Sequence, residues 1–316
     1  MTRIQNILVG VDLHHADRLA ASELSAETQA AVSEALLLAV ACEGTVTFCS
    51  VLELSAQSQS LIEHDHENIL KTVEDIANLV LTRLVNHANH RGIAAESVLR
   101  FGPAWQELSK EAATGQYDMA IVGSRSNSGT FSMLFGSTAK KLMRFSPCPV
   151  WVVKPAELRD VRDVAIATDL SPRSMPAFHM AVTVTRIIGA RLHVLHVLEQ
   201  DDLRYLSMAG VADEELARTE ARLRQTADEE LRTQLHQTDF RTLPLGVKIE
   251  YLVGTTDVAI LDYVSTNQID LLVMGTQGRT QIPGLLLGNT AEQILPGLHA
   301  SLLVVKPSGF KSPYAS

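Results

Sequence analysis

The residues best suited to chemistry lie in a glycine-rich segment near the C-terminal end of the sequence. Residues 275–290 read GTQGRTQIPGLLLGNT, where the last glycine, Gly288, directly precedes the polar pair Asn289 and Thr290. Glycines let backbone N–H groups approach an anion without an intervening side chain, and a helix N-terminus adds unpaired N–H donors. The spacing therefore predicts a phosphate-binding loop that leads into a helix.

An acidic residue, Asp169, follows the strand-like run Val164–Ala167. A carboxylate is unsuited to facing phosphates directly, so it would accept a hydrogen bond from a ribose hydroxyl or hold a metal bound to the phosphates. The alternative is an ordinary cap, because Asp is favoured just before a helix begins. The same two interpretations apply to Asp12, which follows the run Ile4–Val11.

The glycine-rich segment and its surroundings occur twice, which predicts a duplicated domain. Each of the following pairs is separated by 152 positions: Gly102 and Gly254, Gly123 and Gly275, Gly136 and Gly288, and Lys154-Pro155 and Lys306-Pro307. Chance similarity would not keep one spacing over four landmarks. The chain length of 316 residues also fits two domains.

The elements that position these residues alternate between strands and helices in each half. The strands are expected at Ile4–Val11, Thr45–Leu52, Ser97–Phe101, Met119–Val122, Val150–Val153, Val164–Ala167, Arg191–Leu198, Val247–Val253, Leu271–Met274 and Leu302–Val305. The helices are expected at Asp17–Ala41, Glu63–Arg91, Trp105–Thr114, Ser137–Phe145, Arg173–Ile188, Asp213–Leu235, Asp257–Thr266 and Thr290–Leu298. The strands lack polar alternation, so we expect them to be buried on both faces.

This alternation predicts an α/β fold, with two tandem copies of a five-stranded, parallel, Rossmann-like sheet covered by helices on both faces. We expect domains at 1–155 and 163–310, joined by a linker at 156–162. The last strand of each copy is an apolar edge that needs cover. Pairing Val150–Val153 with Leu302–Val305 would join the copies as an intramolecular pseudo-dimer; the alternative is two buried strands that do not pair with each other.

Composition excludes several classes of function. A net charge of −9 argues against nucleic acid, and no uninterrupted apolar run of membrane-spanning length exists. The cysteines Cys42, Cys49 and Cys148 form no CxxC motif, which favours buried thiols in a reducing compartment. The sequence enters a strand directly, without a secretory signal, so we expect a cytoplasmic protein.

Other sites are disfavoured by their spacing. The sequence has neither a GxxxxGK[ST] loop nor a GxGxxG after the first strand, which argues against P-loop NTPases and dinucleotide oxidoreductases. His64 and His66 do not share a helix face and are expected to be solvated rather than metal ligands. His196 is either a lining residue of the pocket or a packed strand residue. No catalytic triad or paired-carboxylate set is supported.

At these positions the chain resembles the universal stress protein family in its tandem two-domain form. The resemblance rests on the G-x2-G-x9-G loop, the Asp after the first strand and the closing Val-Val-Lys strand, and it spans nearly the whole chain. It implies an adenine nucleotide alpha hydrolase-like fold, dimerisation through the last strand, and ATP binding in some members, with Mg or Mn held through the phosphates.

The resemblance also implies the site residues. In the second copy these are Ala167, Thr168, Asp169, Val197, Met274, Gly275, Gln277, Gly278, Gly288, Asn289 and Thr290. In the first copy the corresponding, weaker set is Asp12, Val51, Gly123, Ser126, Gly136 and Ser137. Two departures stand out: Asn289 replaces a Ser or Thr, and Ser126 replaces the loop's second glycine, which would narrow the first pocket.

We therefore expect a stress-response protein that binds ATP or a related adenine nucleotide mainly in the second copy and acts as a sensor or binding module. Two rivals stand beside this: a scaffold that binds no nucleotide and works through its surfaces, and a slow ATPase. The partners expected are the nucleotide and, beyond the pseudo-dimer, a second copy of the chain in a homodimer.

Overall fold

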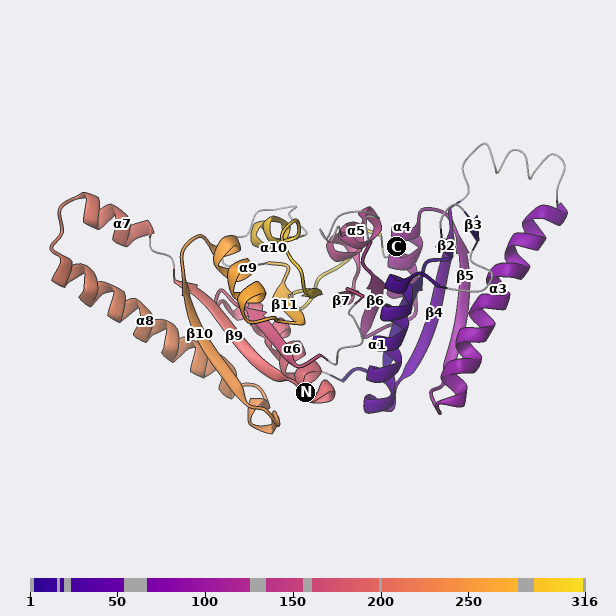
Figure 1. Ribbon diagram of the computed structural model, residues 1–316, viewed down its shortest axis with the longest axis horizontal. Coiled ribbons are helices and arrows are strands. Elements are labelled where there is room, and N and C mark those ends of the chain that lie inside the picture. Colours follow the sequence, from indigo (N-terminus) through magenta and orange to yellow (C-terminus); the bar gives the residue numbers. More distant parts are fainter. Residues whose placement is uncertain are drawn as a thin grey trace. The chain divides into compact units, whose positions relative to one another are not determined.

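The computed structural model describes residues 3–15, 18–19, 24–53, 67–125, 135–155, 161–198, 201–277 and 287–314. The chain divides into two compact units. The N-terminal unit contains Arg3–Arg159 and the C-terminal segment Phe310–Ser316, and the C-terminal unit contains Asp160–Gly309. Figure 1 follows the chain through both units by colour, from indigo to yellow.

The N-terminal unit is built on a five-stranded parallel sheet in the order β5-β4-β1-β6-β7. Its elements are β1 Asn6–Val11, β2 His14–His15, β3 Arg18–Leu19, α1 Ala26–Cys42, β4 Thr45–Leu52, α3 Glu67–His90, β5 Ala95–Phe101, α4 Ala104–Thr114, β6 Met119–Gly123, α5 Ser137–Phe145 and β7 Val150–Val153. The antiparallel pair β2–β3 stands apart from this sheet.

The C-terminal unit repeats the order as β10-β9-β8-β11-β12, again with every pairing parallel. Its elements are β8 Asp163–Ala167, the 3₁₀ turn η1 Pro172–Ser174, α6 Met175–Ile188, β9 Arg191–Leu198, α7 Asp201–Met208, α8 Asp213–His236, the 3₁₀ turn η2 Phe240–Thr242, β10 Val247–Val253, α9 Thr256–Thr266, β11 Leu271–Gly275, α10 Asn289–Ile294 and β12 Ser301–Val305. The predicted fold of two five-stranded parallel sheets is confirmed. The predicted domain boundaries stay a prediction.

Two small details repeat between the units and support duplication. Asp118 Oδ2 accepts hydrogen bonds from the N–H groups of Gln5 and Asn6 at 2.7 and 2.9 Å, just where β1 begins. Asp270 Oδ2 accepts from the N–H groups of residues 162 and 163 at 2.8 and 3.1 Å, where β8 begins. Gly102 and Gly254 also share a left-handed backbone, with φ of +133° and +121°, which favours glycine at both positions.

The expectation that every strand is buried on both faces is wrong for β5 and β10. Both strands consist mainly of half-buried and exposed residues, whereas β4 and β9 are buried after their first residue. In the described sheets β5 pairs only with β4, and β10 only with β9. Each is therefore an outer edge strand, and its solvent contact explains the polar residues it carries.

The helices differ from the prediction mainly at their ends. The sequence pattern predicts that the first helix begins at residue 17, but α1 begins at Ala26, because Ser25 caps it by accepting the Thr28 N–H at 3.2 Å. The preceding chain instead forms the β2–β3 pair. Helix α10 ends at Ile294, four residues before the predicted end, just ahead of Pro296 and Gly297.

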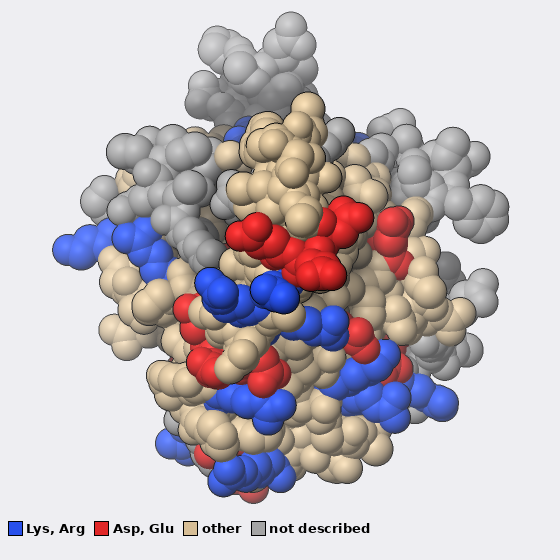
Figure 2. All heavy atoms as spheres, turned by 90° about the vertical axis from the view of Figure 1, so that its left-hand side faces the viewer, with Lys and Arg blue, Asp and Glu red and all other residues tan. Residues whose placement is uncertain are grey.

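A helical hairpin, α7 and α8, projects from the C-terminal unit beyond β10 in Figure 1. The sequence predicted α8 but not α7. Helix α8 begins with the acidic residues 213–215, which suit a helix N-terminus. Figure 2 faces this side of the unit and shows acidic and basic side chains on one surface. Within α8, Glu214 and Arg218 lie 3.9 Å apart as an ion pair. Within the described residues, no helix has the length and apolar character needed to cross a bilayer.

Candidate nucleotide-binding site

The loop after β8 is shaped by its own side chains. Asp169 Oδ1 accepts the N–H of Ser171 at 3.0 Å, and Thr168 Oγ1 accepts the N–H of Leu170 at 3.0 Å. Leu170 has a φ of +61°, in the left-handed region, which costs roughly 1 kcal/mol for a residue other than glycine. Asp169 therefore forms a turn through one carboxylate oxygen, and it does not cap α6 directly.

A second loop follows β11 and meets the start of α10. Thr276 N donates to Val305 O at 3.0 Å, which continues the β11–β12 ladder by one residue. A Cβ atom added at Gly288 would lie 3.2 Å from Thr276 O, so α10 begins directly against this loop. A Cβ atom added at Gly275 would meet Gln277 O at 3.6 Å and no other atom of the described residues within 4 Å. Among the described residues, the space beside Gly275 is open.

Strand register brings the two loops together. Ala167 at the end of β8 aligns with Met274 of β11 on one side and with Leu195 of β9 on the other. Thr168 therefore lies beside Gly275. From β8 the chain first builds β9 and β10 on one side of β8 and then β11 and β12 on its other side. This is the point at which strand order reverses, where open parallel sheets bind ligands.

Three buried polar atoms at this point have no hydrogen-bond partner among the described residues. They are Asp169 Oδ2, Ser171 Oγ and Thr276 Oγ1. Buried polar atoms are nearly always satisfied, so unpaired atoms that share one place call for an explanation. A polar ligand that supplies the missing donors and acceptors is such an explanation.

Apolar residues form the neighbouring wall. Val197 and Met274 are both buried, and Ala167 is half-buried. His196 Nδ1 lies 2.9 Å from Thr168 O; because a carbonyl only accepts, Nδ1 carries the hydrogen. The imidazole thus braces the loop after β8. Gln277 and Thr290 are half-exposed and Asn289 is exposed, while Gly278 lies outside the described residues.

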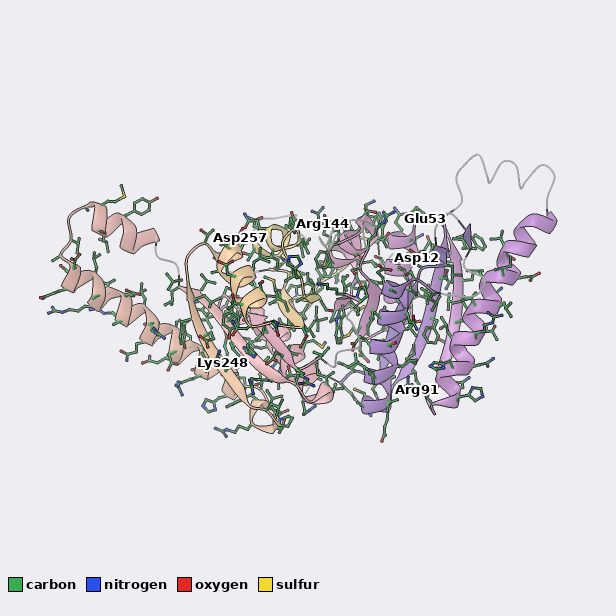
Figure 3. The ribbon with its side chains drawn as sticks, viewed as in Figure 1. Asp12, Glu53, Arg91, Arg144, Lys248 and Asp257 are labelled. Atoms are coloured by element: carbon green, nitrogen blue, oxygen red, sulfur yellow. The ribbon has the colours of Figure 1, made fainter. Side chains whose placement is uncertain are left out.

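The corresponding place in the N-terminal unit is filled. A Cβ atom added at Gly123 would lie 2.6 Å from the backbone oxygen of Glu27, in the first turn of α1. The helix therefore packs directly on Gly123, and glycine is required there for packing. Val51 is buried and Asp12 is exposed. Figure 3 shows Asp12 and Glu53 at one end of this unit's sheet and Arg91 at the other.

The remaining first-copy residues lie near the start of α5. Gly136 precedes α5 with an extended backbone, Ser137 opens the helix, and the Arg125 side chain lies 3.5 Å from the position that a Cβ atom would take at Gly136. Ser126 lies outside the described residues. Among the residues described in either unit, no cluster of three or more His, Cys, Asp or Glu side chains suits a metal ion.

Sequence reasoning missed three residues of the second site. Thr276 stands between Gly275 and Gln277, and Ser171 lies two positions after Asp169. They are marked by buried hydroxyl groups that have no partner in the described part of the chain. Gln234 belongs to the buried stripe of α8, with Ala227 and Leu231, and contacts the loop after β8. A lone glutamine in an otherwise apolar stripe is the signal that would have pointed to it.

Comparison with known proteins agrees with this architecture. The profile of the Universal stress protein family matches residues 3–154 and again 161–306. Universal stress protein E of Photorhabdus laumondii is 23% identical over 321 aligned positions, covering 99% of this chain and 98% of that protein.

Solved structures show the same fold. A crystal structure described as a putative universal stress protein from Pseudomonas aeruginosa superposes with a TM-score of 0.65 at 21% identity, covering 96% of this chain and 94% of that one. A universal stress protein from Archaeoglobus fulgidus gives a TM-score of 0.64 at 21% identity, with 95% and 98% covered. The chain belongs to the Universal stress protein family and carries two of its domains in tandem.

Proposed function

We propose that this protein binds ATP or a related adenine nucleotide at the carboxyl ends of β8 and β11. The observation that carries the proposal is a set of three buried polar atoms, Asp169 Oδ2, Ser171 Oγ and Thr276 Oγ1, that lack a hydrogen-bond partner within the described part of the chain, close to Gly275. A ribose offers hydroxyl donors and phosphates offer acceptors, so one nucleotide matches both needs.

Each residue has a role in this proposal. Asp169 Oδ2 accepts a hydrogen bond from a ribose hydroxyl, while Val197 and Met274 pack against the adenine ring, supported by Ala167 and Thr168. The hydroxyls of Ser171 and Thr276 donate to polar ligand atoms. The phosphates lie along the glycine-containing loop, near Gly275, Gln277, Gly278, Gly288, Asn289 and Thr290. Mg²⁺ or Mn²⁺ enters with the phosphates.

The proposal favours the second copy over the first for a steric reason. In the N-terminal unit the Glu27 backbone oxygen stands directly over Gly123, whereas in the C-terminal unit the described residues leave the space beside Gly275 open. A nucleotide in the first copy would have to displace the first turn of α1. We therefore propose one nucleotide for each chain.

The protein acts, in this proposal, as a cytoplasmic sensor or binding module. The loop groups contact the nucleotide through hydrogen bonds that are equally available before and during any reaction, and such uniform binding does not accelerate chemistry. The pairing of Val150–Val153 with Leu302–Val305, and a homodimer, remain predictions beside it.

The test uses two aspartates at matching positions. ATP is titrated into the wild-type protein, Asp169→Asn and Asp12→Asn, and binding is followed by calorimetry. Because hydrogen bonds to charged groups contribute about 1.5–3 kcal/mol, Asp169→Asn is expected to weaken binding about tenfold or more, and Asp12→Asn to leave it unchanged.

Two outcomes would contradict the proposal. A wild-type protein that binds no adenine nucleotide would leave the scaffold as the better account. Rapid phosphate release in the presence of Mg²⁺ or Mn²⁺, lost in Asp169→Asn, would make the protein an ATPase.

A further inference from the structure

Gln234 occupies an unusual place for an uncharged polar side chain. It lies on α8 and is only 7% exposed, within the buried stripe that Ala227, Leu231 and Leu235 complete. Burial of an amide is unfavourable unless its hydrogen-bonding groups find partners. The partners of Gln234 therefore indicate why a glutamine is present.

Those partners belong to the loop after β8, more than sixty residues earlier in the chain. Gln234 Nε2 donates to Leu170 O at 2.7 Å and to Ser171 O at 3.2 Å. An amide nitrogen carries two hydrogens, so both are used on two successive carbonyls of one loop. Ser174 Oγ, which donates to Ser171 O at 2.7 Å, closes the network.

The loop needs this support because one of its residues, Leu170, has a left-handed backbone conformation that is unfavourable for a residue other than glycine. Leu170 holds a φ of +61°, and its N–H is fixed by Thr168 Oγ1. Its carbonyl is fixed from the other side by Gln234. The same loop carries Asp169, whose Oδ1 is used internally and whose Oδ2 is unpaired among the described residues. The conformation in which Oδ2 is buried without a partner among the described residues is thus held from both sides.

We propose that Gln234 is a positioning residue: by donating to Leu170 O and Ser171 O it holds the loop in the conformation that presents Asp169 to the ligand. Helix α8 thereby sets the affinity of the site without touching the nucleotide. This inference rests on the proposed function for its effect on ATP, but its effect on the loop does not depend on any ligand.

The test compares two glutamines of the same helix. Gln234→Met removes the donor and keeps the length of the side chain. Gln225→Met makes the same change at an exposed position, where Nε2 contacts only Glu229 in the described structure. Gln234→Glu keeps the shape of the amide and replaces its NH₂ group, so it tests donation in case the methionine variant does not fold.

Two readouts separate positioning from general stability. Hydrogen exchange at the amides of Leu170 and Ser171 is measured without nucleotide, and the ATP dissociation constant is measured well below the melting temperature. In Gln234→Met and Gln234→Glu we expect exchange at both amides to rise at least tenfold and the dissociation constant to rise about tenfold. Gln225→Met is expected to change neither.

The outcomes are distinguishable. Unchanged exchange at Leu170 and Ser171 in the Gln234 variants would overturn the positioning role, whatever ATP does. Faster exchange with an unchanged dissociation constant would overturn the link to the ligand. A wild-type protein without ATP affinity would refute the proposed function and with it that link, while the exchange measurement would still decide whether Gln234 holds the loop.

Discussion

Two glycines at matching positions, Gly123 and Gly275, are expected to respond in opposite ways to the same substitution. Neither has a positive φ, so alanine is compatible with both backbones. In Gly123→Ala the new methyl group would lie 2.6 Å from the backbone oxygen of Glu27. In Gly275→Ala it would lie 3.6 Å from Gln277 O, an ordinary van der Waals distance.

The magnitudes follow from these two distances. A contact of 2.6 Å with backbone forces α1 away from the sheet, and overpacking of this kind costs about 1–3 kcal/mol. Replacing glycine at a compatible site instead stabilises by about 0.4–1 kcal/mol, through the unfolded state. A loss of about 2 kcal/mol corresponds to a decrease in Tm of about 4–8 °C for a domain of this size.

The assay is scanning calorimetry of both variants beside the wild-type protein, with transitions assigned to each unit by hydrogen exchange of β1 and β8 amides. Gly123→Ala is expected to lower the transition of the N-terminal unit, and Gly275→Ala to leave that of the C-terminal unit unchanged or slightly raised. Equal decreases of the two melting transitions would show that Gly123 and Gly275 are equally crowded, and would refute the proposed difference between the two copies.

Two further predictions concern the N-terminal unit. Burial raises the pKa of Cys49 to about 12 and that of Cys148 to about 11, so both thiols stay protonated at pH 8. A disulfide reagent should therefore label only the half-buried Cys42 promptly. Two or three prompt labels in mass spectrometry would contradict this. The ring of Tyr314 packs edge-on against Trp105, with 4.9 Å between the ring centroids. Tyr314→Ala should therefore destabilise this unit by about 1–2 kcal/mol. An unchanged midpoint in urea denaturation would show that the C-terminal segment contributes nothing to the stability of the unit.

Sequence patterns predicted the fold well where local signals are strong. The predicted bounds of β4 and β9 match the structure at both ends, because each is a mainly apolar run that starts on a polar residue and is followed by a glutamate. The predicted bounds of the edge strand β10 also match the structure, but the strand is partly exposed where the sequence predicts burial on both faces. Whether a strand lies at an edge depends on which strands pair with it, and composition does not carry that information.

The site was predictable in outline and not in its contacts. The positions of Asp169 shortly after β8 and of Gly275 at the end of β11 follow from the strand pattern of the sequence. The closeness of Glu27 to Gly123, and of Gln234 to Leu170, depends on how helices pack on the sheets. Such contacts join residues far apart in the chain, so spacing alone could not reveal them.

The most direct test of the central claim is the number of ATP molecules bound by the wild-type chain and by Gly275→Val. A Cβ atom at Gly275 would meet Gln277 O at an ordinary 3.6 Å and nothing nearer among the described residues, so valine should reach into the ligand site and leave the fold intact. Isothermal titration calorimetry is expected to give one ATP for each wild-type chain and none for Gly275→Val. Full binding by that variant, or two equal sites in the wild-type protein, would contradict a nucleotide site at β8 and β11 alone.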